Sequence, residues 1–252
     1  MADMYIIANS DLTAVADAIR TKVGTTDKLS FPTGFVSTIN GIQNAPATYI
    51  EETYNNSGNL TSAIVHGCTK IRQSVFRYSS YLTQVTIPGN VTEIAPQAFD
   101  HCDQLATVNL PDAITLIDSN AFQGCLTFNT EKLPDGLTEI GSMAFYGCRS
   151  LALSNLPAGI KTIGSEAFSQ CQKLTLTIIP AALTSIRAKA FYNCTGLTSL
   201  TFQGAPTEIA GDAFEGCTNL TTINVPWAEG AVANAPWGAT GAAINYNYEA
   251  NH

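Results

Sequence analysis

The sequence predicts an elongated solenoid in which short parallel strands stack coil upon coil with a period of 23 residues. Three observations predict this fold: the fixed spacing of phenylalanines, the spacing of the cysteines that follow them, and the alternation of apolar and polar residues in between. A single coil cannot bury its own apolar face, so neighbouring coils must stack to form a common core. In-register stacking then places residues i and i+23 side by side.

The strictest signal is a column of seven phenylalanines, each 23 residues after the last. A cysteine follows three residues after six of them, and an isoleucine stands five residues before all seven. The alternating piece of each copy predicts a short strand that ends at a proline, and the Ala-Phe-x-x-Cys piece predicts a helical or 3₁₀ turn. The two columns, which we expect to be buried, are Phe76, Phe99, Phe122, Phe145, Phe168, Phe191 and Phe214, and Cys102, Cys125, Cys148, Cys171, Cys194 and Cys217.

The strand pieces are of two kinds. In the coil that starts at Leu82 the inward residues follow the standard spacing, whereas in the coils that start at Phe128, Leu151 and Leu174 the second apolar residue comes one place early. Side chains alternate along a strand, so a shift by one place exposes core residues unless a bulge absorbs it. We predict bulges around residues 131–132, 154–155 and 177–178, stacked in three consecutive coils.

Composition excludes several classes of function. The net charge is −8 and only 13% of residues are charged, so no basic patch offers the footprint that nucleic acid requires. No apolar run approaches the roughly 18 residues of a membrane span. The first nine residues lack the basic and apolar regions of a signal peptide, so we expect synthesis in the cytoplasm without the general secretory signal.

The residues that most resemble a metal or catalytic site occupy their positions because of the repeat. Six cysteines lie one per coil, so they form a column and not the convergent cluster that a metal site needs, and their parallel Cβ vectors argue against disulfides. We therefore expect buried free thiols, no metal and no cofactor, and Cys68 has no assignment. His66, His101 and His252 are isolated and are interpreted as surface or loop residues.

Glu166, Lys189 and Asp212 occupy one position in three consecutive coils and predict a stripe of alternating charge along the rod. A pair of catalytic carboxylates is the alternative, but the lysine between them favours charge complementarity on a solvated face, where such pairs contribute ~0–1 kcal/mol. We predict no catalytic residue.

Function must then come from the outward faces. Exposed tyrosines are favoured interface anchors, and ladders of threonine and asparagine could bind a glycan or a protein, although a solvated strand face has the same composition. The candidate binding residues are Tyr78, Tyr81, Tyr146, Tyr192, Thr86, Asn109, Thr201 and Asn224.

The two ends of the chain do not repeat. Residues 1–44 predict a small α-helical module for attachment or oligomerisation, with Leu12, Val15 and Ile19 on one helical stripe and Phe35 and Ile39 on a second short helix. These helices must pack on the first coil or on another subunit. Residues 45–54 predict a linker and residues 55–226 the solenoid. Residues 227–252 predict a C-terminal cap, in which the last coil is covered by Trp227, Trp237, Tyr246 and Tyr248.

The repeat C-x-x-L-x-x-V-x-L-P-x-x-I-x-x-I-x-x-x-A-F resembles the BspA-type, or Treponema pallidum-type, leucine-rich repeat over residues 55–226. The resemblance implies a leucine-rich-repeat solenoid and a role as a surface adhesin or interaction protein. The segment from Ser10 to Ile42 and the ending from Val225 to Tyr246 resemble parts of phage and prophage tail-associated proteins. That second resemblance implies a protein of the virion.

Taken together, these patterns favour a non-enzymatic virion protein that is tail-associated and recognises the host surface through its solenoid. The expected partners are other virion proteins, bound through the N-terminal module, a host-surface glycan or protein, and further copies of the chain, with a trimer the favoured oligomer. The alternative is a BspA-like adhesin or protein-interaction module on the bacterial cell surface. An enzyme acting on cell-wall glycan is disfavoured, because no carboxylate pair converges on a cleft.

Overall fold

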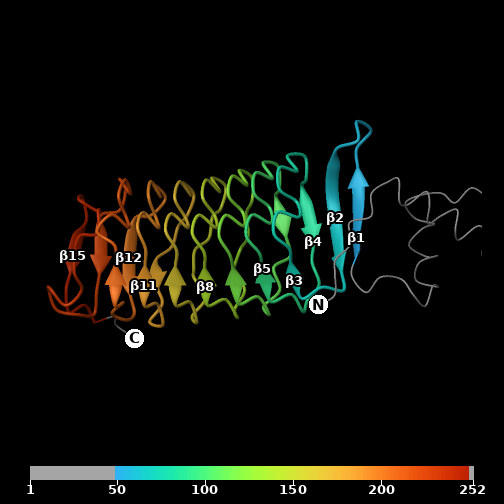
Figure 1. Cartoon of the computed structure of the whole chain (residues 1–252). Helices are drawn as coiled ribbons and strands as arrows, with labels where there is room; N and C mark the ends of the chain where they lie inside the picture. The colour runs from blue at the N-terminus through green and yellow to red at the C-terminus, as the bar shows by residue number, and fades with distance from the viewer. Residues whose placement is uncertain (1–48, 250–252) are drawn as a thin grey trace, which may run out of the picture.

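The computed structural model describes residues 49–249, which form a rod of stacked coils running from β1 to β15 (Figure 1). The strands are short, and residues 49–249 contain no helix. This part of the chain therefore has no helix that could cross a membrane. The predictions made for residues 1–44, among them those for Leu12, Val15, Ile19, Phe35 and Ile39, lie outside the described residues.

The strands form three sheets. The first contains β1 (Tyr49–Tyr54), β2 (Leu60–His66), β4 (Gln84–Thr86) and β6 (Thr107–Val108). The second contains β10 (Ile178–Ile179), β12 (Ser199–Phe202), β14 (Thr222–Asn224) and β15 (Ala243–Asn245). The third runs along the seven phenylalanine coils through β3 (Lys70–Ile71), β5 (Glu93–Ile94), β7 (Leu116–Ile117), β8 (Glu139–Ile140), β9 (Thr162–Ile163), β11 (Ser185–Ile186) and β13 (Glu208–Ile209).

Pairing confirms the 23-residue period. In the third sheet Ile71 pairs with Ile94, Ile94 with Ile117, and so on along the rod, always in parallel. The exception is the first hairpin, where β1 pairs with β2 antiparallel and closes that end of the first sheet. Residues 49–54, which the sequence assigned to a linker, are therefore a strand of the solenoid. The linker assignment failed because β1 has no counterpart in the repeat from which the solenoid was recognised.

The phenylalanine column is the centre of the core, as predicted. All seven rings are buried, and neighbouring ring centroids lie 4.9 to 5.5 Å apart. Trp237 continues the column, because it is fully buried and its carbonyl accepts a hydrogen bond from the backbone N–H of Phe214. The expected cap is thus a further coil: Trp227 is also buried, Tyr246 packs partly on the core, and Tyr248 is exposed.

The turns around the phenylalanines are not helical, which corrects the sequence-based expectation. The first six turns have a left-handed residue two places before the aromatic ring, and all seven phenylalanine turns have another two places after it. Such residues interrupt a right-handed helix. Backbone donors are divided between the same turn and the next coil. The N–H of Arg77 donates to Ser74 at 3.2 Å, whereas the N–H of Phe76 donates to Ala98 of the next coil at 2.9 Å. Stacking hydrogen bonds thus take the place of helical ones.

The cysteine column lies beside the phenylalanines, and its six thiols are buried and free, as predicted. Cys68, which had no assignment, is also buried and free. Each thiol of the column donates a hydrogen bond to the carbonyl of the phenylalanine in the preceding coil, at 2.9 to 3.1 Å. Burial raises the pKa of the Cys102 and Cys217 thiols to about 12. The thiols are therefore protonated donors that link successive coils.

The strand ladder is interrupted where the spacing of apolar residues shifts. Residues 129–133 and 152–156 belong to no strand, so the first sheet ends at β6 and the second begins at β10. The predicted irregularity thus occurs around 131–132 and 154–155, but as a gap in the sheet in place of a bulge. At the third position β10 pairs in register with β12, so the prediction around 177–178 is wrong for Ile178. There the shifted Leu176 is buried before the strand begins, and Thr177 turns outward.

An asparagine side chain extends the contact between the coils of β4 and β6 beyond their paired residues. The Oδ1 atom of Asn109 accepts a hydrogen bond from the Ile87 backbone N–H at 2.7 Å, and its Nδ2 atom donates to the Ile87 carbonyl at 3.0 Å. The side-chain amide therefore satisfies both backbone groups of Ile87, the residue that follows β4. Asn129 contributes similarly by accepting from the Ala152 backbone N–H at 2.9 Å.

Candidate binding surface at the first coils

The structure does not bring the eight candidate binding residues together. Tyr78 and Tyr81 lie in the turn between β3 and β4, and Tyr146 and Tyr192 lie in turns farther along the rod. The four threonine and asparagine residues are distributed over the coils of the first and second sheets. The first two tyrosines are the most exposed, at 62% and 47%. Thr86 is exposed on β4.

Several of the other candidates are used to hold the stack together. Asn109 is occupied by Ile87, as described above. Asn224 donates to the Thr201 hydroxyl at 3.1 Å and accepts from Asn245 at 2.8 Å, forming a ladder along the second sheet. The Tyr146 hydroxyl accepts from Gln170 at 2.8 Å. These contacts join neighbouring coils and reduce the polar groups left for a ligand.

The charge stripe also differs from its prediction. The Asp212 carboxylate accepts a hydrogen bond from the Lys189 backbone N–H at 3.2 Å, and the Lys189 ammonium lies 5.3 Å from the centroid of the Tyr192 ring. Within residues 49–249 no ion pair joins Glu166, Lys189 and Asp212. Glu166 and Lys189 share a left-handed backbone, with φ values of 56° and 54°, which Asp212 does not adopt.

A cluster that the sequence did not single out lies beside Tyr78. Its centre is Asp100, whose side chain is only 3% exposed. One carboxylate oxygen accepts from Arg77 Nε at 2.8 Å, and the other lies 2.5 Å from His101 Nδ1. The Arg77 guanidinium also donates to the Tyr78 hydroxyl at 3.1 Å and lies 4.6 Å from the centroid of that ring. The rings of Tyr78 and His101 are 5.4 Å apart.

The backbone at this cluster is unusual for its residue types. Tyr78 and His101 have φ values of 60° and 55°, in the left-handed region. That conformation is nearly free for glycine and costs another residue roughly 1–2 kcal/mol. The same position holds glycine or asparagine in four later coils, at Gly124, Gly147, Asn193 and Gly216. The first two coils thus place bulky aromatic side chains where the rest of the rod mostly uses permissive residues.

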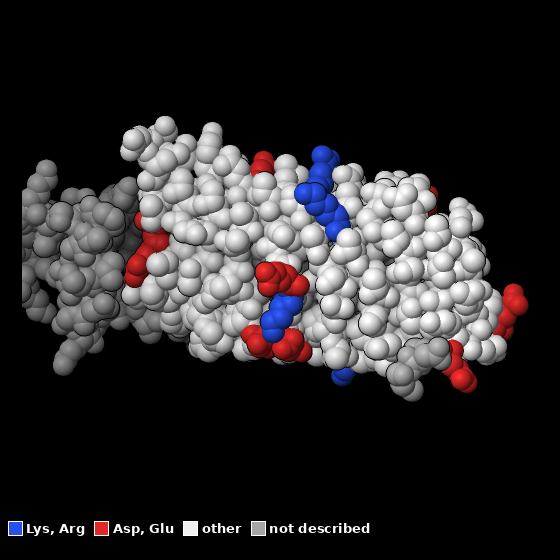
Figure 2. All heavy atoms as spheres, turned by 180° about the vertical axis from the view of Figure 1, so that it is seen from behind, with Lys and Arg blue, Asp and Glu red and all other residues white. Residues whose placement is uncertain are grey.

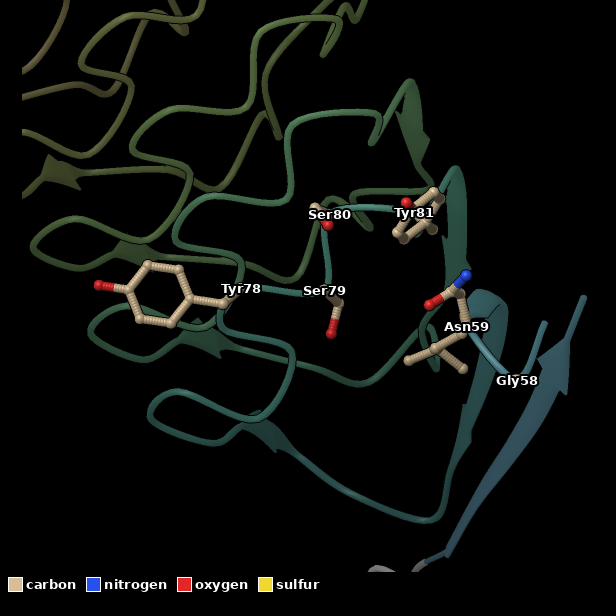
Figure 3. A pocket seen from close by; sticks show the side chains of 7 residues that line it. Gly58, Asn59, Tyr78, Ser79, Ser80 and Tyr81 are labelled. Carbon is tan, nitrogen blue, oxygen red and sulfur yellow. The ribbon is translucent and has the colours of Figure 1, made fainter.

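A shallow recess of about 250 Å³ lies next to the cluster. The β1–β2 turn contributes Gly58 and Asn59 to its lining, and the turn of the first coil contributes residues 78–81. In Figure 3 the Tyr81 side chain lies beside Asn59, whereas the Tyr78 ring points away from it on the far side of Ser79. The two tyrosines therefore lie on two adjacent parts of one surface. We call the set Arg77, Tyr78, Tyr81, Asp100 and His101, with the recess, the first-coil surface.

Charge is sparse on the rod. Figure 2 shows a side on which charged side chains are few and mostly single, apart from one compact group of both signs. Lys132 bridges Asp112 and Asp135 on the exposed surface, and the pKa of Asp112 is lowered by the backbone N–H of Asp135 and by Lys132. Within the described range no group of three or more His, Cys, Asp or Glu side chains is placed to hold a metal ion.

Sequence comparison gives a family match. Residues 37–129 and 116–230 match the model of the BspA type leucine rich repeat region, in six copies. No curated protein matches the sequence.

Several solved structures are similar to this chain at low sequence identity. A leucine-rich repeat protein from Bacteroides ovatus is 20% identical, with 78% of this chain and 74% of that chain covered and a TM-score of 0.38. The leucine-rich repeat protein of T. pallidum is 22% identical, with 70% and 81% covered and a TM-score of 0.43. A leucine-rich cell surface protein from Faecalibacterium prausnitzii is 19% identical, with 82% and 97% covered and a TM-score of 0.39.

Proposed function

Because the chain belongs to the BspA-type leucine-rich repeat family, we propose that it is a non-enzymatic binding module that recognises a protein through the first-coil surface. The observation that carries the proposal is the pair of left-handed aromatic residues, Tyr78 and His101. Backbone strain of this kind persists where the surrounding structure holds it in place, and it concentrates at functional sites. Here the buried Asp100 holds His101 and Arg77, which in turn contacts Tyr78.

The composition of the surface supports a protein partner. Tyrosine and arginine are the residues most enriched at the energetic centres of protein interfaces. Exposed apolar side chains are also concentrated at this end of the rod, where Tyr54 is 44% exposed and Ile64 is 41% exposed, close in sequence to Tyr78 and Tyr81. An interface over the first coils would therefore combine exposed apolar side chains with an arginine anchor.

The location at which the protein acts is a separate question. The family match supports an interaction module and gives no support to a virion role, which depends on the resemblance of residues 10–42 and 225–246 to tail-associated phage proteins. Mass spectrometry of purified phage particles and labelling of intact bacterial surfaces would distinguish a virion protein from a cell-surface one.

The binding proposal is tested by screening the full chain against arrayed bacterial-surface and host extracellular proteins. Three forms are compared: the wild type, Tyr78→Ala, and Tyr192→Ala as a control at a partly exposed tyrosine of a later coil. We expect partners whose affinity falls at least tenfold for Tyr78→Ala and stays unchanged for Tyr192→Ala, as for a hot-spot residue. Partners that bind the Tyr78→Ala variant as tightly as the wild type would place the interface elsewhere.

A further inference from the structure

The hydrogen bonds of Arg77 leave part of its guanidinium available. A guanidinium carries five N–H donors. The Nε donor is used by Asp100 and one Nη2 donor by the Tyr78 hydroxyl. Within residues 49–249 the remaining three donors have no acceptor, and the side chain is 35% exposed. An arginine that is fixed in place with unfilled donors at a partly exposed position is suited to a planar acceptor from outside.

The charged groups around the Tyr78 ring indicate the sign of the charge that a ligand carries. A cationic ligand would meet the guanidinium that already lies 4.6 Å from the Tyr78 centroid. An anionic ligand would meet the free donors instead. Carboxylate is the anion of protein side chains whose geometry matches two parallel N–H donors. Asp100 does not also accept from the free donors of Arg77, because its two carboxylate oxygens are engaged by Arg77 Nε and His101 Nδ1.

His101 adds a second point of contact. Its Nδ1 atom is held by Asp100, its side chain is 45% exposed, and its Nε2 atom remains for a polar group of the ligand. A side chain at position 124 would cover this ring, because a Cβ atom there would lie 3.2 Å from His101 Cδ2 and 3.4 Å from Nε2. Glycine at position 124 thus keeps one side of the imidazole open.

From these contacts we infer that the partner presents the carboxylate of an aspartate or glutamate to Arg77, next to the Tyr78 ring and His101. The inference rests on the proposed function and adds the chemistry of the group that is recognised. A protein segment is favoured over an acidic glycan because the exposed apolar side chains of Tyr54, Ile64 and Tyr81 lie at the same end of the rod. Their apolar surface suits an interface with a core of apolar and aromatic contacts.

The test is a selection from a displayed library of random peptides with the full-length chain as bait and Tyr78→Ala as the counter-selection. Each selected peptide is resynthesised with its acidic residues changed one at a time, Glu→Gln or Asp→Asn. We expect one acidic position per peptide whose amide form binds roughly tenfold more weakly, the loss typical of a charged hydrogen bond. The Arg77→Lys variant keeps the charge and loses the fork, so it should bind the acidic peptides more weakly and show a smaller effect of the amide change. Arg149→Lys, at an exposed arginine elsewhere, should behave as the wild type.

The outcomes separate the inference from the proposed function. Peptides that depend on Tyr78 but tolerate every amide substitution would overturn the carboxylate assignment and leave the binding function standing. Failure to find any peptide that distinguishes the wild type from Tyr78→Ala would overturn both. Binding of polygalacturonate that depends on Tyr78, with no acidic peptide selected, would assign the site to an acidic glycan and overturn the protein assignment. The substitution on the peptide decides the matter even if Arg77→Lys folds poorly.

Discussion

The thiol of Cys125 donates a hydrogen bond to the backbone carbonyl of Phe99 in the preceding coil, with 3.0 Å between the two atoms. The same contact is made by the other five cysteines of the column, so each coil is fastened to the one before it directly beside the stacked rings. The repeat thus uses its small apolar position as a polar link between coils.

Loss of one such link should destabilise the rod. For Cys148→Ala we expect a decrease of about 1–3 kcal/mol in the free energy of unfolding, from a lost hydrogen bond and a small cavity. Denaturant titration measures the change. The exposed Ser154→Ala should stay within about 0.5 kcal/mol of the wild type. Equal effects of the two substitutions would contradict a structural role for the thiol.

Alkaline pH should weaken the fold through the same thiols. Burial raises the pKa of Cys102 and Cys217 to about 12, whereas an unfolded thiol titrates near 8.5. Above that pH the unfolded chain loses protons that the folded chain retains, so stability falls as pH rises. The contribution is fully present below about pH 8.5 and is lost progressively towards pH 12. Denaturation midpoints at pH 8, 9 and 10 should decrease in that order, less steeply for Cys217→Ala.

Strain at Tyr78 can be measured by comparing two substitutions. Tyr78→Gly and Tyr78→Ala remove the same contacts, but only glycine adopts the left-handed backbone without penalty. We expect the glycine variant to be more stable by about 1 kcal/mol, with both variants deficient in binding. Gly147→Ala, at an open left-handed position, should lose a similar amount. If Tyr78→Ala proved as stable as Tyr78→Gly, strain would not be stored at this residue.

Asp100 should matter for both stability and binding. Its replacement by alanine leaves the Arg77 and His101 side chains without their shared acceptor, and we expect a loss of about 1–3 kcal/mol, limited by the partial exposure of both partners. Thermal denaturation and the peptide affinities described above measure the two effects. Gln123→Ala, at the corresponding position of the next coil, is the control and should leave peptide binding unchanged.

Asn109 should stabilise the contact between the coils of β4 and β6. Asn109→Ala leaves the N–H of the buried Ile87 without its acceptor, so a loss of about 1–3 kcal/mol is expected. Asn90→Ala, at an exposed loop position, provides the comparison in the same denaturation experiment. Binding assigned to the first-coil surface should be unaffected. A neutral Asn109→Ala variant would mean that water or a rearranged coil replaces the amide.

Much of this fold could be predicted because the period alone fixes which side chains become neighbours. The phenylalanine and cysteine columns follow directly from it. The turn conformation could not, since Glu166 and Lys189 have no preference for a left-handed backbone and adopt one only because the stack requires it. Trp237 lies one full period after Phe214, yet it was predicted to belong to a cap because the segment around it does not follow the repeat.

Only part of the candidate site could be predicted from the sequence. Tyr78 was recognised as an exposed aromatic residue, but Arg77 and Asp100 lie 23 residues apart and meet only across two coils. Aligning the column from Tyr78 to Gly216 would have signalled the site, because two bulky residues precede a series of mostly glycine and asparagine. The choice of hydrogen-bond partners within the cluster depends on side-chain geometry that spacing does not contain.

The gap between β6 and β10 gives the rod unequal stiffness on its different sides. The third sheet crosses the same coils without a break, so bending that stretches it must separate strand pairs. Bending that stretches the interrupted side separates none at residues 129–133 and 152–156. A load applied at one end should therefore curve the molecule in a preferred direction, and the first-coil surface would turn with it.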